Sequence, residues 1–373
     1  MSVKPVQVKE ATLAARMVLI GSTEAYSGKS AAILGLAEFM RRDRLRVTYG
    51  KPIGACMEGD CLSDGLDPDI QFMADTLELS ADDIPPVLLR LDESAIRDRI
   101  AHPETEPFAE ALSTYGRDID TDVVLLEGPG TLHEGELFGM SLQHMAERMG
   151  AKVVLIARYD SILIADSLLV ARQQLQQYLA GVIVNDVPAD ELDKVNGEIV
   201  PFLEQRGIPI LGVLPTNRIL RSISVGELVH QLEARVLCCD DRLDLMVEEF
   251  TIGAMNVNSA LKYFRKAQHQ AVITGGDRTD IQLAALETST HCLILTGQLP
   301  PSALILSRAE ELEVPILSVD LDTLTTVERI ERVFGQVRLH EAVKVRCIQE
   351  LILKNCDMSR LYKALDLALP LAS

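Results

Sequence analysis

Hydrophobic residues gather in short runs, which alternate with longer stretches where apolar positions recur at helical spacing. Six runs in the first 215 residues are strand-sized and nearly all apolar: Met17–Gly21, Arg46–Tyr49, Val123–Leu126, Lys152–Ile156, Gly181–Val184 and Ile210–Val213. Segments of helical length lie between them, among them Ser30–Arg41 and Ser167–Leu179. Apolar strands that alternate with helices are typical of a parallel sheet covered by helices. The pattern therefore predicts an α/β fold, whose ligands bind at the carboxyl ends of the strands.

The same alternation continues on a smaller scale after Pro215. It predicts strands at Ala271–Thr274, His291–Thr296 and Pro315–Val319, and helices at Thr279–Glu287, Ser302–Glu313 and Thr326–Phe334. A turn followed by a helix start at Ser224 marks the joint. We therefore expect one domain over residues 1–215 and a second over 216–340. We expect residues 341–373 to form a helical tail, helical until Pro370, which docks on the body of the protein or on a second subunit.

Charge and composition exclude several classes of protein. The 36 Lys and Arg residues stand against 55 Asp and Glu residues, a net charge of −19. Such acidity disfavours binding to nucleic acid or to an anionic membrane. No apolar run approaches the roughly 20 residues that span a bilayer, and the N-terminus lacks the pattern of a signal peptide. Seven cysteines, an odd number, suit reduced thiols, so we expect a cytoplasmic protein without membrane insertion.

The strongest chemical signal is a candidate phosphate loop, MVLIGSTEAYSGKS, at residues 17–30. A predicted strand runs into Gly21, and the loop ends in Gly28-Lys29-Ser30 before a predicted helix. In such loops, backbone N–H groups surround a phosphate, the lysine reaches the terminal phosphates, and the hydroxyl binds Mg²⁺. Six residues separate the two glycines where the usual pattern has four, so an ordinary strand-to-helix turn remains the alternative.

Two further residues follow neighbouring strands. Glu127 ends the strand at residues 122–127, where a partner for Mg²⁺ belongs. Lys51 follows another strand and is expected to face the same crevice. For either residue, a solvated strand end is the alternative. The three signals together favour a nucleotide site.

The second block has its own candidate site, Gly275-Gly276-Asp277-Arg278-Thr279, after a strand and at a helix start. We expect the two glycines to permit an unusual turn, Asp277 to cap the helix, and Arg278 to hold a carboxylate or phosphate. The alternative is a structural corner in which Arg278 pairs with a local acid.

These motifs resemble known families. The loop ending in GKS, KPIG, LLEGPG, GVIVND and IPILGVLPTN resemble the dethiobiotin synthetase-like branch of the P-loop NTPases. SISVGEL, FTIGAMNVNSALKYF, VITGGDRTDIQLAALE, LILTGQLPPS and DTLTTVERI resemble a DRTGG domain. The combination is similar to the N-terminal regulatory half of long bacterial phosphate acetyltransferases. Only about 40 residues follow Ile330, too few for the acetyltransferase domain, so we do not expect that activity.

The resemblance implies roles for single residues. Lys29 and Ser30 match the residues that bind phosphates and Mg²⁺, Glu127 and Asp69 match metal ligands, and Asn185 matches the residue that reads the base. Lys51 matches the lysine that holds the substrate and its carbamate, and with Lys29 it is our candidate catalytic residue. We place the nucleotide on the loop and on one distant residue: Gly21, Ser27, Gly28, Lys29, Ser30, Ala31 and Asn185.

Departures from the family guide the choice of function. The loop is one residue longer than in the synthetase, and Gly54-Ala55 stands where the synthetase carries a small hydroxyl residue. We therefore favour a regulatory protein that binds ATP and Mg²⁺, with the DRTGG domain passing that state to an unidentified protein partner or to another subunit of a homo-oligomer. The alternatives are an ATP-dependent ligase acting on a carboxylate or carbamate, and a scaffold that binds nothing.

Overall fold

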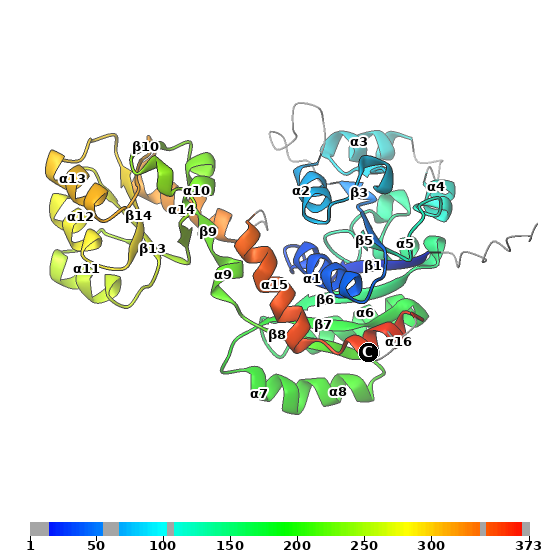
Figure 1. The fold of residues 1–373 in the computed structure, drawn as a ribbon. Helices are drawn as coiled ribbons and strands as arrows, with labels where there is room; N and C mark the ends of the chain where they lie inside the picture. Colours follow the sequence, from blue (N-terminus) through cyan, green and yellow to red (C-terminus); the bar gives the residue numbers. More distant parts are fainter. Residues whose placement is uncertain (1–14, 55–66, 103–107, 336–340, 368–373) are drawn as a thin grey trace, which may run out of the picture. The chain divides into compact units, whose positions relative to one another are not determined.

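The computed structural model describes residues 15–54, 67–102, 108–335 and 341–367. The chain forms two units: Met1–Thr216 together with His340–Ser373 make unit 1, and Asn217–Leu339 make unit 2 (Figure 1). The C-terminal segment that we set apart as a tail is therefore part of unit 1. In the part of the chain that is described, no helix has the length and apolar character needed to cross a bilayer.

Unit 1 contains a six-stranded parallel sheet in the order β2-β5-β1-β6-β7-β8. Its strands are β1 (Arg16–Ser22), β2 (Val47–Gly50), β5 (Val123–Glu127), β6 (Lys152–Arg158), β7 (Leu179–Val187) and β8 (Ile210–Pro215). The central strands are buried almost throughout, which explains why their sequences are apolar at consecutive positions. The predicted α/β fold with a covered parallel sheet is confirmed.

Helices cover both faces of this sheet. One face packs against α5 (Leu142–Met149), α6 (Ile164–Leu175) and α8 (Val200–Gln205). The other carries α1 (Lys29–Arg42), α15 (Ala342–Asn355) and α16 (Met358–Ala364), and the blue helix α1 lies beside the red helix α15 in Figure 1. Beside the sheet are a small pair of strands, β3 (Ile53–Gly54) and β4 (Leu89–Arg90), and the helices α2 (Pro68–Thr76), α3 (Glu93–Ala101) and α4 (Ala109–Thr114).

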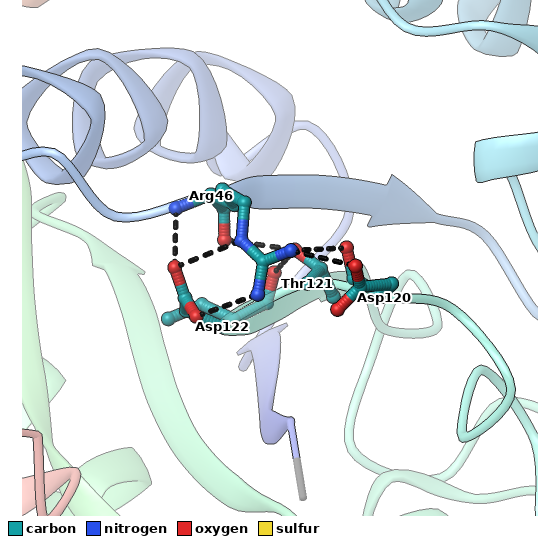
Figure 2. Close-up of polar contacts among 5 residues, drawn as sticks. Arg46, Asp120, Thr121 and Asp122 are labelled. Atoms are coloured by element: carbon teal, nitrogen blue, oxygen red, sulfur yellow. Dashed lines mark hydrogen bonds and ion pairs between the residues drawn. The ribbon is translucent and has the colours of Figure 1, made fainter. Parts of the chain in front are cut away.

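A polar cluster fastens β2 to β5 at the amino end of the sheet, away from the candidate site (Figure 2). The Arg46 guanidinium forms ion pairs with Asp120 at 2.9 Å and with Asp122 at 3.1 Å, and the Arg46 backbone N–H donates to Asp122 at 2.8 Å. The Thr121 hydroxyl donates to the Arg46 carbonyl at 2.8 Å. Hydrogen bonds from Arg46 lower the pKa of Asp122 below its ordinary value. The cluster therefore fixes the register of the strand that leads to Lys51.

The C-terminal segment is held to unit 1 by close contacts. A Cβ added to Gly35 of α1 would lie 2.4 Å from the Ile352 side chain of α15, so the glycine permits a close helix crossing. The helix that we expected to run on to Pro370 is interrupted at Cys356, which is extended and bridges to Gly212 of β8. The Tyr362 hydroxyl then donates to Asp43 at 2.6 Å.

Unit 2 has a five-stranded sheet in the order β10-β15-β14-β13-β12, with β10 antiparallel to β15 and the others parallel. Its strands are β10 (Arg235–Cys238), β12 (Glu249–Ile252), β13 (Gln270–Gly275), β14 (Thr290–Thr296) and β15 (Ile316–Ser318). Helices α11 (Val257–Phe264), α12 (Thr279–Leu286) and α13 (Ala303–Glu311) cover one face, and α10 (Val225–Leu232) and α14 (Thr323–Gly335) cover the other. A short pair, β9 (Ile223–Ser224) and β11 (Met246–Val247), completes the unit.

Candidate functional site

The phosphate loop joins β1 to α1 at the carboxyl edge of the unit 1 sheet, the position predicted from the sequence. Lys29 is the first residue of α1, and Gly28 is its N-cap residue with φ of 98°. The N-cap residue of α1 has no side chain to accept from the backbone N–H groups of the first turn, so the N-terminal end of this 14-residue helix has no capping carboxylate or hydroxyl. The uncapped N-terminus of α1 therefore favours the binding of an anion in the phosphate loop.

The Lys29 side chain is buried, and its ammonium donates to the Ser22 hydroxyl at 3.0 Å. Ser22 in turn lies 2.9 Å from the carbonyl oxygen of Gly130, in the loop that follows β5. Burial lowers the pKa of Lys29, an effect that the negative charges of Glu127 and Glu134 oppose and the positive charge of Lys51 reinforces. The ammonium is thus poorly solvated, and a phosphate group would stabilise it.

Ser30 and Glu127 meet at the base of the loop. The Ser30 hydroxyl donates to Glu127 Oε1 at 3.1 Å, and the Tyr49 hydroxyl donates to Oε2 at 2.9 Å. Glu127 and Tyr49 are both buried. Burial and the neighbouring Glu127 charge raise the pKa of Tyr49 well above its usual value, so the phenol remains a donor. Tyr49 was not among the predicted site residues, although its position beside Lys51 at the end of β2 was visible in the sequence.

Lys51 also reaches this end of the sheet, but two carboxylates hold it. Its ammonium lies 2.8 Å from Asp67 Oδ2 and 3.2 Å from Asp69 Oδ2. Burial lowers the pKa of Lys51, but the charges of Glu127, Asp69 and Asp67 outweigh burial and raise it above the ordinary value. Lys51 is therefore a fixed cation, suited to hold an anionic group and unsuited to act as a base.

The acid that opens the helix after the KP segment is Asp67. It is the N-cap residue of α2, and its Oδ1 accepts from the Asp69 backbone N–H at 2.9 Å. Asp69, which we had matched to that place, stands in the first turn of α2 and pairs with Lys51. Ala55, the second residue of the Gly54-Ala55 pair in which this chain departs from the synthetase, lies outside the described residues.

Asn185, predicted to read the base, contacts the phosphate loop itself. Its amide Nδ2 donates to the carbonyl oxygen of Ser27 at 2.9 Å. A Cβ on Gly28 would lie 2.6 Å from the same nitrogen and would displace the Asn185 amide, and the positive φ of Gly28 favours glycine independently. The Ser27 hydroxyl is buried and has no hydrogen-bond partner among the described residues, which leaves one polar group of the loop unsatisfied.

The remaining predicted loop residues have structural surroundings. A Cβ on Gly21 would lie 2.3 Å from the Leu142 side chain of α5, so any larger residue would force Leu142 to shift. Ala31 is buried in the first turn of α1. The structure therefore brings Lys29, Ser30, Glu127 and Lys51 to one end of the sheet, whereas Gly21 and Ala31 shape the strand and helix that carry them.

These residues fit Mg²⁺ in company with phosphate. Among the described residues, no three His, Cys, Asp or Glu side chains gather closely enough to hold a metal by themselves. Mg²⁺ is commonly held by one or two protein oxygens with phosphate oxygens and water completing its shell. The Ser30 hydroxyl and the Glu127 carboxylate, already in contact, are oxygen donors of that kind.

The second predicted site lies wholly within unit 2. A cavity of about 290 Å³ opens at the carboxyl ends of β12 and β13, lined by Gly253, Ala254, Ile273, Thr274, Gly275, Asp277, Arg278 and Thr323. The expectation that Asp277 caps α12 is wrong: Arg278 is the N-cap residue, and no side chain caps the helix. Asp277 Oδ1 instead lies over Gly275, where a Cβ would approach it to 2.5 Å. Thr279 begins α12 beside the cavity.

Comparison with known proteins identifies both units. A profile of the AAA domain family AAA_26 matches residues 16–224, and a profile of the DRTGG domain matches residues 227–333. The first match spans more than half of the chain, and the chain therefore belongs to this AAA domain family, with a P-loop domain followed by a DRTGG domain.

The curated relatives are longer proteins. The chain is 27% identical over 376 residues to the phosphate acetyltransferase of Nitratidesulfovibrio vulgaris, an alignment that covers 92% of this chain and 50% of that protein. It is 26% identical over 344 residues to the phosphate acetyltransferase of Synechocystis, covering 88% of this chain and 48% of that protein. The chain thus spans about half the length of the curated relatives it matches.

Similarity to solved structures is distant. The CBS and DRTGG domains of the regulatory region of Clostridium perfringens pyrophosphatase, complexed with the activator diadenosine tetraphosphate, align at 18% identity and a TM-score of 0.27, over 45% of this chain and 85% of that one. Chloroplast FtsY from Physcomitrella patens aligns at 15% identity and a TM-score of 0.35, over 58% of this chain and 63% of that one. At these scores, neither bears on the function of this chain.

Proposed function

We propose that this AAA domain protein is a nucleotide-dependent regulator: unit 1 binds ATP with Mg²⁺, and unit 2 senses a second signal or mediates assembly. One observation carries the proposal. Lys29, Ser30 and Glu127 come from two different strand-to-helix or strand-to-loop junctions and meet at one end of a parallel sheet. Burying charged side chains without a ligand is unfavourable in free energy, and apolar residues would be more stable at this end of the sheet if it bound no polar ligand.

Each group has a role that its chemistry permits. The buried Lys29 ammonium and the N-terminus of α1 supply positive charge for the terminal phosphates. Ser30 and Glu127 supply oxygen ligands, and a bound Mg²⁺ would neutralise phosphate charge between them. Asn185 holds the loop through Ser27 and so keeps its backbone in a fixed conformation.

The regulatory part of the proposal is supported by the path of the chain. Helix α15, which follows unit 2 in the sequence, packs directly along α1. Helix α1 carries Lys29 and Ser30 at its N-terminus. A change at α15 therefore has a packed route to the phosphate loop, and nucleotide binding has the same route back, as linkage between two sites requires. Through this route we propose that the nucleotide state reaches a partner protein or a second subunit of a homo-oligomer in the cytoplasm.

A ligase that acts on a carboxylate or carbamate is the second candidate, and Lys51 favours it. The side chain is a buried cation close to Glu127, where it could hold an anionic substrate beside the nucleotide. The ion pairs with Asp67 and Asp69 weigh against this function, because a substrate anion would have to compete with both carboxylates.

Isothermal titration with ATP, in the presence and absence of Mg²⁺, tests the proposal. Loss of a buried charged contact predicts that Lys29→Ala binds about tenfold to a hundredfold more weakly than the unaltered chain. Lys354→Ala, which removes an exposed lysine from α15, is the matched control and should bind normally. Chelation of Mg²⁺ should weaken binding in both control and unaltered chains.

The same preparations distinguish the two candidate functions. For a regulator, we expect ATP to bind, and any release of ADP to be the same in the unaltered chain and in Lys51→Ala. A ligase gives ADP release that a carboxylate or amine stimulates and that Lys51→Ala abolishes. Absence of ATP binding in the unaltered chain, or equal binding in the Lys29→Ala variant, would overturn the proposed nucleotide site.

A further inference from the structure

The cavity of unit 2 has the composition of a small-ligand site. Its volume of about 290 Å³ lies near the lower end of the range for ligand pockets. It lies at the carboxyl ends of adjacent parallel strands, where open α/β sheets bind ligands. Its lining combines the apolar residues Ala254 and Ile273 with four polar residues: Thr274, Asp277, Arg278 and Thr323.

Asp277 offers a free acceptor in this cavity. Its side chain is exposed and has no hydrogen bond or ion pair with any residue that the structure describes. Ionised carboxylates accept hydrogen bonds at both oxygens, and a carboxylate after a parallel strand is well placed to receive two adjacent hydroxyl groups of a ribose.

Arg278 offers a directed cation next to it. Its Nε and Nη2 atoms approach Asp280 at 3.3 and 3.5 Å, and Nη2 donates to the Met255 carbonyl oxygen at 3.0 Å. The Nη1 atom has no partner among the described residues, so its two N–H groups remain available. The contacts to Asp280 and Met255 fix the guanidinium plane, which reduces the entropy lost when it binds a phosphate.

The turn that carries both residues is held from beneath by Gln282. This fully buried side chain donates from Nε2 to the carbonyl oxygens of Gly275 at 2.9 Å and Gly276 at 3.1 Å. Those carbonyl oxygens are thereby turned into the protein, and their partial negative charge is compensated. Gly276 has no room for a side chain, because a Cβ would lie 2.0 Å from the Leu299 carbonyl oxygen. Hydrogen bonds and close packing therefore hold this turn in one conformation.

From this arrangement we propose that the unit 2 cavity binds a phosphorylated ribose, as in a nucleoside monophosphate. Asp277 accepts from the ribose hydroxyl groups, and Arg278 binds the phosphate through Nη1. Gln282 acts as a positioning residue. The size of the cavity suits one sugar phosphate. This deepens the sensing role proposed for unit 2, and it does not depend on the phosphate loop of unit 1.

The test uses the full chain with Lys29→Ala, which weakens binding at the phosphate loop, and the variants below on the same background assign the remaining binding to the unit 2 cavity. Ribose 5-phosphate, AMP, adenosine and inorganic phosphate are titrated separately by calorimetry. We expect ribose 5-phosphate and AMP to bind at concentrations up to about 1 mM, and adenosine and inorganic phosphate each to bind about tenfold more weakly. Tighter binding of AMP would assign a nucleotide as the ligand, and equal binding a sugar phosphate.

Variants then locate the site. Asp277→Ala removes a side chain without a structural partner, so it should leave the thermal unfolding unchanged and weaken binding about tenfold or more. Arg278→Ala should weaken phosphate-dependent binding by a similar factor. The control Arg265→Ala removes an exposed arginine at the end of α11 and should bind normally. Failure of ribose 5-phosphate and AMP to bind, equal binding of inorganic phosphate, or unchanged binding in Asp277→Ala would overturn the proposal, whatever the outcome at Lys29.

Discussion

Two hydroxyl groups hold the Glu127 carboxylate, one at each of its oxygens. Ser30 donates to Oε1 and Tyr49 to Oε2. The positive charges of Lys29 and Lys51 interact favourably with the negative charge of Glu127. If Mg²⁺ and phosphate bound as proposed, the Ser30 hydroxyl would serve as a metal ligand, and Tyr49 would keep the carboxylate in position. Tyr49 is thus a positioning residue of the proposed metal site.

We therefore expect Tyr49→Phe to change the metal dependence of nucleotide binding. The change removes a buried hydrogen bond to a charged group, which costs about 1.5–3 kcal/mol of unfolding free energy. The Mg²⁺ concentration needed for half-maximal ATP binding should also rise, because the carboxylate loses one of its two fixed contacts. Titration of Mg²⁺ at constant ATP measures the second effect.

Tyr159→Phe is the matched control. The Tyr159 hydroxyl donates to Glu191 Oε2 at 2.9 Å, the same distance as in the pair of Tyr49 with Glu127. It should lose some stability and keep the Mg²⁺ dependence of the unaltered chain. An identical Mg²⁺ dependence in the two variants would show that Tyr49 has only a structural role.

Some features of single residues could be predicted from the sequence, and others could not. The Gly28-Lys29-Ser30 motif and the strand-end acid Glu127 were predictable, because the order of strand, loop and helix determines which groups lie at the carboxyl edge. The contacts of Asn185 with Ser27 and of Gly21 with Leu142 join residues distant in sequence. Such contacts depend on packing, which local patterns do not specify.

At the scale of elements, α15 is the helix whose partner the sequence left open. Its apolar stripe indicated that it docks, but amphipathic spacing does not identify the surface that receives it. The structure shows that the surface is α1, at the point where Gly35 allows Ile352 to approach. The strands were easier to predict, because burial on both faces leaves continuous apolar runs in the sequence.

Ile352→Ala tests this packing. Ile352 is fully buried, so truncation should reduce the stability of unit 1 by about 2–5 kcal/mol through lost burial and a cavity. Hydrogen exchange measured by mass spectrometry should show faster exchange in α1 peptides, while peptides of α12 in unit 2 keep their rates.

The neighbouring Leu353 supplies the control. Its side chain is 49% exposed, so Leu353→Ala should change stability by no more than about 0.5 kcal/mol. Equal protection of α1 in the unaltered chain and in Ile352→Ala would contradict the role assigned to the α1–α15 contact.

At the scale of the whole molecule, unit 1 is discontinuous in sequence. Its sheet ends with β8, the chain then forms unit 2, and α15 and α16 return to cover the sheet. Besides the α1 contact, Arg360 Nη1 donates to the Ile210 carbonyl oxygen at 3.0 Å, and Tyr362 donates to Asp43. A boundary drawn after Pro215 therefore separates helices from the sheet that they cover.

This connectivity predicts that a fragment of residues 1–216 fails to bind ATP normally, although it retains Lys29, Ser30, Asn185 and Glu127. The fragment leaves exposed the surface that α15 and α16 bury. Each buried apolar side chain lost contributes about 1.5–3 kcal/mol, and the total is comparable to the whole stability of an ordinary domain. The fragment should lack a cooperative thermal transition, and a peptide of residues 341–373 added in trans should restore both the transition and ATP binding. A fragment that unfolds cooperatively and binds ATP as tightly as the full chain would show that the phosphate loop is independent of the segment that returns from unit 2, and the proposed route through α15 would then carry no regulation.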